Sequence, residues 1–423
     1  MNSSQLIDIV DVVCHSFRHL NPRLMNHGER VAYILMKMLE GTNYYTKQEK
    51  QDIFMLGLLH DIGAYKEDEI DAMLSFDRED SMEHSVFGYL LFQNFSPLSE
   101  YADIVLYHHH CDAQYYPVPI GNYHRDIARL VYLADRIDIF CILQGGEGLD
   151  SFLDKYADNM FSSAGIRWFH AANKKYNVLE CIRNGTYQEE FSKYTRESIA
   201  LTEEQIHKYL IMFVFSMDFR NECTALHTSY AVHLSENFAN TLHLPPTACQ
   251  TIQLAAMLHN IGTAAIPANL SSTDGYECSL KEIYQNSTLD VTRKILSGAV
   301  DPQIIKVIED SFQILKCWIE QEPVPFRPTP ATEIVALSYF ISNILSNDPD
   351  LSHHPKMVRF LKGKYLSCKM DNTILETLEN YFQPILEQTQ ASCASASRTY
   401  HHVMDEYHYL NTILIHYNTK YKW

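Results

Sequence analysis

Apolar residues recur along this chain at the three- and four-residue spacing of amphipathic helices. One predicted buried face runs through residues 31–39 and another through residues 127–134. The apolar–polar alternation typical of strands between turn residues is nearly absent. Glycine and proline, 15 of each, fall mostly between the helical runs. The pattern predicts an all-α protein.

Three segments in the first half of the chain resemble three segments in the second half. Residues 26–39 resemble 226–239, residues 54–65 resemble 252–264, and residues 128–140 resemble 332–344. The spacing of their histidines also matches, because 33 residues separate His27 from His60 and 32 separate His227 from His259. Matching segments at matching intervals indicate an internal repeat. We therefore expect a tandem duplication of a helical domain.

The chain of 423 residues is long enough for two or three domains. We place the first domain at residues 1–200, the second at 201–385 and a C-terminal helical extension at 386–423. The extension combines small residues with an aromatic, histidine-rich helical pattern. We expect it to pack on the second domain.

The formal charge of −18 argues against a surface for a nucleic-acid polymer or an anionic membrane. The ten cysteines are scattered and include no CxxC pair, which suits buried thiols in a reducing compartment. The N-terminus lacks the basic start and long apolar core of a signal peptide, and the most apolar run is too short to span a bilayer. These features predict a cytoplasmic protein whose partners include neither nucleic-acid polymers nor membranes.

Imidazole and carboxylate side chains gather in the first half of the chain, the mixture that a hydrolytic metal pair needs. The candidates are His27, His60, Asp61, His84, His108, His109 and Asp135. Each lies at helical spacing from apolar residues and should point towards the core, where an unpaired polar group is costly. For any single histidine, an ordinary polar residue near the core is the simpler interpretation. The adjacent pairs at 60–61 and 108–109, each after an apolar helical run, favour metal binding by the whole set.

These motifs resemble those of the HD-domain metal-dependent phosphohydrolases, and within them the HD-GYP branch, over roughly residues 20–190. The segment HGERVA from His27 resembles the first ligand helix, and LLHDIG around His60 and Asp61 resembles the HD signature. Glu83-His84, the histidines from His108 and the segment ADRID at 134–138 resemble the remaining ligand segments. The resemblance implies one metal held by His27, His60, Asp61 and Asp135, and another held by His84, His108 and His109, with Asp61 bridging.

The resemblance implies two divalent ions, and iron or manganese fits the nitrogen and carboxylate ligands. Arg23 stands where some members carry the glutamate that holds a third metal. In the expected mechanism, a water between the two ions is deprotonated and the resulting hydroxide attacks phosphorus in line. Besides Asp61, we expect catalytic roles for Arg30 and Arg136 near the phosphate charge and for Lys66 near the leaving oxygen. A solvated helix face or a structural ion pair is the alternative for these three cations.

The substrate-facing positions depart from the family pattern. The family lysine after HDIG is Ala64 here, the glutamate of the HHE triplet is His110, and GYP survives only as Tyr115-Tyr116-Pro117. Members of the HD-GYP branch hydrolyse cyclic di-GMP and related cyclic dinucleotides, so we predict a phosphodiesterase for such a substrate. Another nucleotide or phosphate ester is the alternative substrate. A non-catalytic protein that senses a nucleotide, or serves as a scaffold, is the alternative in another class.

The second copy lacks most of the ligand candidates. His227 and His259 remain, but Asn260 replaces the bridging aspartate and Tyr339 stands where Asp135 would be. Residues 307–310, where paired histidines should fall, contain none. We therefore expect no metal pair there and core roles for the two histidines. The copy could buttress the first domain, form a homodimer surface or bind a regulatory ligand, and a structural role is the default.

Overall fold

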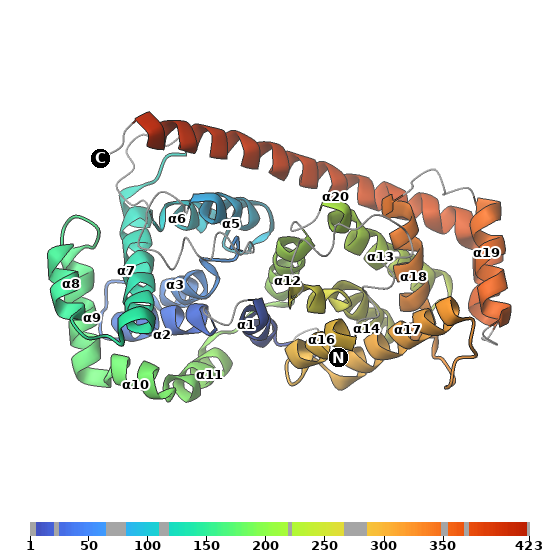
Figure 1. Cartoon of the computed structure of the whole chain (residues 1–423), viewed down its shortest axis with the longest axis horizontal. Coiled ribbons are helices and arrows are strands. Elements are labelled where there is room, and N and C mark those ends of the chain that lie inside the picture. The colour runs from blue at the N-terminus through green and yellow to red at the C-terminus, as the bar shows by residue number, and fades with distance from the viewer. Residues whose placement is uncertain are drawn as a thin grey trace. The chain divides into compact units, whose positions relative to one another are not determined.

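The computed structural model describes residues 6–20, 25–64, 82–109, 118–218, 222–265, 286–347, 354–367 and 372–420 (Figure 1). Helices dominate these residues, which contain isolated β-bridges but no β-strand. The prediction of an all-α protein is confirmed. A search of the same residues finds no helix with the length and apolar character needed to cross a membrane.

The chain divides into two compact units. The first unit comprises residues 22–216 and 403–423, and the second unit comprises residues 1–21 and 217–402. Residues 1–21 thus group with the second half of the chain, and the extension divides between the units after residue 402. The division into domains at residues 200 and 385 remains a proposal.

The first unit is built from short and medium helices around one apolar core. Its helices are α2 (His27–Glu40), α3 (Lys47–Leu59), α5 (Met82–Phe95), α6 (Ala102–Tyr107), α7 (Asn122–Gln144), α8 (Leu149–Lys155), α9 (Ser163–Tyr176), α10 (Val178–Asn184), α11 (Tyr187–Ser198) and α12 (Glu203–Asp218). A 3₁₀ turn, η3 (Ser99–Tyr101), precedes α6. The last part of α20 (Asn372–Lys420) completes the unit.

Local sequence fixes where α3 begins and ends. The Thr46 side chain accepts a hydrogen bond from the Glu49 backbone N–H at 3.2 Å, and the Glu49 carboxylate accepts one from the Thr46 N–H at 2.7 Å. This capping box satisfies two amides that a helix start leaves without partners. The apolar residues from Ile53 to Leu59 are buried, and the helix ends with His60 as its cap. The end of a buried helix therefore holds His60 at the core.

Two glycines allow the backbones that carry histidines to approach closely. A Cβ atom added to Gly28, next to His27, would lie 2.5 Å from the carbonyl oxygen of Leu58. A Cβ atom added to Gly63 would lie 2.2 Å from the carbonyl oxygen of His84. Any other residue would push these segments apart. The glycines therefore bring α2 against α3, and the turn after α3 against α5 (Figure 1).

The second unit is also helical. Its elements are α1 (Ile9–Leu20), α13 (Glu222–Thr241), α14 (Pro246–Leu258), η4 (Ile261–Ala265), α16 (Asn286–Leu296), α17 (Pro302–Glu320), α18 (Pro330–Asn347), α19 (His354–Ser367) and the first part of α20. Backbone hydrogen bonds from Asp8 to Ala299 at 2.7 Å and from Asp301 to Leu6 at 2.8 Å hold the N-terminal segment in this unit. The amide of Asn237 in α13 donates to Thr389 of α20 at 2.9 Å, which fixes the first part of α20 on α13.

Candidate metal centre

Five helices of the first unit bring the predicted ligand residues to one place. His27 opens α2, His60 and Asp61 follow α3, His84 lies in α5, His108 and His109 follow α6, and Asp135 lies in α7. Six of these side chains are buried, and the seventh, Asp61, is 13% exposed. Ionisable groups withdrawn from water at this density need compensation by one another or by a bound ion.

The potential ligand atoms form two groups that share Asp61. Asp61, His84, His108 and His109 form one group, and His27, His60 and Asp61 form the other. Within each group the atoms lie within 4.8 Å of one another. Asp135 lies beside the second group, with its Oδ1 atom 3.3 Å from His27 Nε2.

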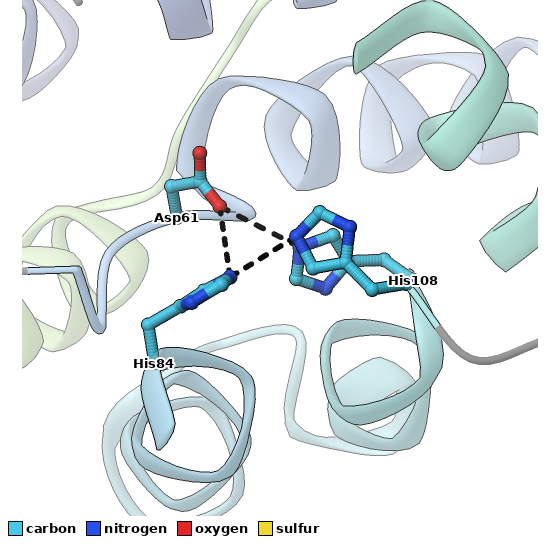
Figure 2. Close-up of side chains that lie close together, drawn as sticks. Asp61, His84 and His108 are labelled. Carbon is cyan, nitrogen blue, oxygen red and sulfur yellow. Dashed lines mark hydrogen bonds and ion pairs between the residues drawn. The ribbon is translucent and has the colours of Figure 1, made fainter. Parts of the chain in front are cut away.

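Each oxygen of Asp61 faces a different group. Its Oδ1 atom lies 3.5 Å from Nε2 of both His84 and His108, as Figure 2 shows. Its Oδ2 atom lies 3.1 Å from His60 Nε2 and 3.5 Å from His27 Nε2. A single carboxylate can therefore contribute one oxygen to each of two adjacent ligand sets.

Hydrogen bonds orient three of the histidine rings in the same way. The Nδ1 atom of His27 lies 2.7 Å from Asp138 Oδ2, that of His60 lies 2.8 Å from the Gly57 carbonyl, and that of His108 lies 2.6 Å from the Val105 carbonyl. An ionised carboxylate or a carbonyl oxygen can only accept, so each Nδ1 carries the hydrogen in these bonds. In a neutral ring, the Nε2 lone pair is then left for a ligand.

Several buried atoms at the centre lack hydrogen-bond partners. Among the described residues these include Nε2 of His27, Nε2 of His60 and both carboxylate oxygens of Asp61. Buried polar atoms left in this way are destabilising, so native proteins rarely contain several together. A divalent metal accepts lone pairs from imidazole nitrogen and carboxylate oxygen. The residues present therefore fit a metal site.

The pKa values at the site favour metal ligation. Burial lowers the pKa of His84 to about 3, and burial together with His108 holds the pKa of His109 well below its usual range. For Asp61, burial acts to raise the pKa, but the charge of His60 and the nearby rings of His108 and His27 outweigh it and lower the pKa well below normal. Neutral imidazoles beside an ionised carboxylate are the forms in which these groups bind metals.

His27 differs from the other candidate ring ligands. Burial alone would lower its pKa, but the nearby carboxylates of Asp135, Asp138 and Asp61 outweigh burial and raise the pKa well above the usual value. A raised pKa favours the protonated ring, and a metal ion that bound at Nε2 would have to displace that proton.

The two arginines expected near the phosphate lie in ion pairs with carboxylates. The Arg30 guanidinium donates to both oxygens of Asp138, at 2.6 Å from Nε and 3.0 Å from Nη2. The Arg136 guanidinium donates to Asp135 Oδ2, at 2.9 Å from Nε and 2.8 Å from Nη2. Each arginine thus acts on a carboxylate at the centre. A role for either one at a phosphate remains a prediction.

Some predicted residues lie outside the described part of the chain. These are Arg23, Lys66, His110 and the segment 115–117. Asp138, in contrast, is described, and the sequence analysis gave it no role of its own. The available signal was its position three residues after Asp135, which places both carboxylates on one face of α7.

The corresponding histidines of the second unit have different surroundings. Nε2 of His227 lies 3.1 Å from Nε2 of His259, and the Tyr339 ring packs edge-on against both, with centroids 4.8 and 4.7 Å away. Burial lowers the pKa of His259 to about 4 and, together with His259, holds the pKa of His227 well below normal. The described residues of this unit contain no group of three or more potential metal ligands.

Comparison with known families agrees with this geometry. Residues 24–140 match the HD domain, a span that runs from before His27 to beyond Asp138. The chain therefore contains an HD domain, as its motifs predicted.

One similar protein is the "3'3'-cGAMP-specific phosphodiesterase 1" of Vibrio cholerae serotype O1, which is 24% identical over 275 residues. The alignment covers 59% of this chain and 62% of that protein, and so less than two thirds of the relative's length. No solved structure matches the chain.

Proposed function

We propose that the first unit is a metal-dependent phosphodiesterase that hydrolyses a cyclic dinucleotide. The observation that carries this proposal is the buried cluster in which Asp61 offers one oxygen to each of two ligand groups. The HD-domain match and the name of the similar phosphodiesterase support it. Cyclic dinucleotides contain two phosphodiester bonds, and adjacent divalent ions suit the hydrolysis of such bonds.

In this proposal two divalent ions, iron or manganese, are held by the two groups. His27, His60, Asp61 and Asp135 hold one ion, and Asp61, His84, His108 and His109 hold the other. Such ions act as Lewis acids towards phosphoryl oxygens and lower the pKa of a bound water. The protein keeps Asp61 ionised, and burial keeps His84 and His109 neutral.

The arginines act on the ligands in this scheme. Arg136 holds Asp135 through two donors to one oxygen, and Arg30 holds Asp138, which in turn contacts His27. Both guanidinium groups are largely buried. They therefore hold these carboxylates in one orientation. Lys66 keeps its proposed role near the leaving oxygen.

The substrate class comes from two sources. The family resemblance suggests cyclic di-GMP, and the similar phosphodiesterase is named for 3'3'-cGAMP. Both are cyclic dinucleotides with the same phosphodiester chemistry, and they differ in one base. We therefore propose the class and let a direct comparison of the two compounds decide between them.

The test assays the full chain, loaded with manganese or with iron, against 3'3'-cGAMP, cyclic di-GMP and a generic phosphodiester. We expect turnover of a cyclic dinucleotide, with a loss of at least about 100-fold in His60→Ala and Asp61→Ala. The matched control is Asn260→Ala, which removes the residue at the corresponding position of the second unit and should leave turnover unchanged. Circular dichroism confirms that each variant is folded.

Two results would overturn the proposal. One is turnover that survives unchanged in folded His60→Ala and Asp61→Ala. The other is a chain that takes up neither manganese nor iron when these are supplied, yet binds a cyclic dinucleotide without cleaving it, which would establish a nucleotide-sensing protein instead.

A further inference from the structure

We infer that Arg30 and Asp138 form a positioning pair that prepares His27 as a metal ligand. The inference rests on the proposed metal site. Asp138 is fully buried, His27 is 4% exposed and the Arg30 side chain is 13% exposed. The three side chains therefore form a buried, hydrogen-bonded series that runs from Arg30 through Asp138 to His27. It lies next to Asp61 and Asp135.

Both oxygens of Asp138 are engaged. Oδ1 accepts from Arg30 Nε at 2.6 Å, and Oδ2 accepts from Arg30 Nη2 at 3.0 Å and from His27 Nδ1 at 2.7 Å. The fork-shaped guanidinium fixes the plane of the carboxylate, because it binds both oxygens at once. The fixed carboxylate then fixes the ring, because it can accept only from a protonated Nδ1.

The helices α2 and α7 supply these groups in matching pairs. His27 and Arg30 are three residues apart on α2, and Asp135 and Asp138 are three residues apart on α7. Residues at this spacing lie on the same face of a helix. Each helix therefore presents one ligand candidate and one positioning residue. A rotation of the His27 ring would break its contact with Asp138 and turn Nε2 away from Asp135 Oδ1, 3.3 Å distant.

The second unit offers a comparison within the same chain. Ser342, three residues after Tyr339 on α18, lies with its hydroxyl 2.9 Å from His227 Nδ1. Tyr230 occupies the position three residues after His227, where the first unit has Arg30. The Ser342 hydroxyl donates its one hydrogen to the Tyr339 carbonyl at 2.8 Å, so it accepts from His227 Nδ1 as Asp138 accepts from His27, but it carries no charge. The unit that lacks the arginine–carboxylate pair is also the one whose described residues contain no ligand cluster.

The test measures manganese affinity in the full chain by dialysis against graded chelator, followed by elemental analysis. The first variant, Asp138→Ser, places a serine beside His27, as the second unit has Ser342 beside His227. The second, Arg30→Gln with Asp138→Asn, keeps an acceptor for His27 and leaves no buried charge without its partner. The matched control is Glu309→Gln, because Glu309 accepts from Arg293 Nε at 2.6 Å in an ion pair far from the site in sequence.

We expect Asp138→Ser to weaken the binding of one ion by about 10–100-fold, with the other retained. The double variant should weaken the same ion by about tenfold, since an amide keeps the tautomer but lacks the charge. The electron paramagnetic resonance spectrum of bound manganese should then no longer show the magnetic coupling between two ions. Excess manganese should restore that coupling. Glu309→Gln should behave as the wild type.

Wild-type affinity for both ions in either folded variant would overturn the inference. A wild-type chain that binds neither manganese nor iron would overturn the proposed function instead, so the two failures are distinguishable. Unfolding of the metal-free variants by urea serves as the second readout. If Asp138→Ser lowers only that stability and leaves manganese affinity unchanged, the pair is structural and the inference is wrong.

Discussion

Among the described residues, Asp61 is the one side chain that belongs to both groups of candidate ligands. Its two oxygens face His60 and His27 on one side and His84 and His108 on the other. The equivalent position in the second unit is Asn260, whose amide nitrogen is a donor and cannot take the place of the second oxygen.

Changing Asp61 to asparagine is therefore a small change in shape and a large change in ligand chemistry. We predict that Asp61→Asn lowers the metal content to at most about one ion per chain and abolishes turnover of a cyclic dinucleotide. Elemental analysis of the purified protein and the phosphodiesterase assay provide the measurement. An unchanged metal content would show that Asp61 is not shared between two ions.

The buried histidine pair of the second unit should make the stability of the folded chain depend on pH. Burial lowers the pKa of His259 to about 4 in the folded chain, whereas an unfolded histidine titrates near about 6.5. The unfolded state therefore binds more protons below pH 6.5, so stability is complete above that pH and falls as the pH falls towards 4. Between pH 7 and pH 5, His259 should contribute a loss on the order of 1–2 kcal/mol.

Urea unfolding of the wild type and of His259→Gln at pH 7 and pH 5 tests this prediction. The glutamine variant should lose less unfolding free energy between the two pH values, because it lacks the titrating group. An equal loss in both proteins would show that the burial of His259 does not affect stability through proton binding.

At the scale of the element, the ends of helices position several of the candidate ligands. His60 caps α3, His108 caps α6 and His27 opens α2. Side chains at helix ends can converge from several directions, whereas side chains within one helix are limited to its own surface. The turn after α3 is held against α5 because Gly63 has no Cβ atom.

We predict that Gly63→Ala moves the turn and α5 apart, since the new Cβ atom would meet the His84 backbone. Overpacking of this kind destabilises a protein by about 1–3 kcal/mol, and here it should also reduce metal affinity. Gly41→Ala is the matched control, because nothing lies within 4 Å of its added Cβ atom. Thermal unfolding measures the stability of both variants, and metal analysis measures their metal affinity. Equal behaviour of the two variants would contradict the role given to Gly63.

The sequence predicted the helices and the clustering of the candidate ligands better than it predicted the partners of charged groups. Periodicity identified the buried faces of α2 and α7, and adjacent polar pairs identified His60-Asp61 and His108-His109. The pairing of Arg30 with Asp138 joins residues 108 positions apart. Local patterns carry no information about such a contact, so the sequence could not show that Arg30 is held by a carboxylate. Helical spacing could place Asp138 on the same face as Asp135, but it could not identify Arg30 and His27 as its partners.

At the scale of the whole molecule, corresponding elements of the two units repeat the same local contacts. His60 Nδ1 contacts the carbonyl of Gly57, and His259 Nδ1 contacts that of Ala256, each three residues earlier. Asp138 contacts His27 Nδ1, and Ser342 contacts His227 Nδ1. These pairs support the proposed duplication. They also suggest that the second copy lost its ligands while it kept the packing around its histidines.

This proposal predicts that ligands can be restored. A chain carrying Asn260→Asp and Tyr339→Asp, expressed with manganese, should bind about one ion more than the wild type, because two imidazoles and two carboxylates would then converge. Elemental analysis counts the ions, and Tyr339→Phe, which supplies no ligand, is the control. No additional ion in the folded variant would argue against an equivalent arrangement of the two copies.

The central claim is that a metal pair in the first unit cleaves a cyclic dinucleotide. Its most direct test is a titration of the metal-free full chain with manganese while cleavage of 3'3'-cGAMP and of cyclic di-GMP is followed. We predict no cleavage without metal and a rate that rises to a plateau near about two ions per chain. Cleavage that does not depend on added metal, or a metal-loaded chain that cleaves neither compound, would contradict it.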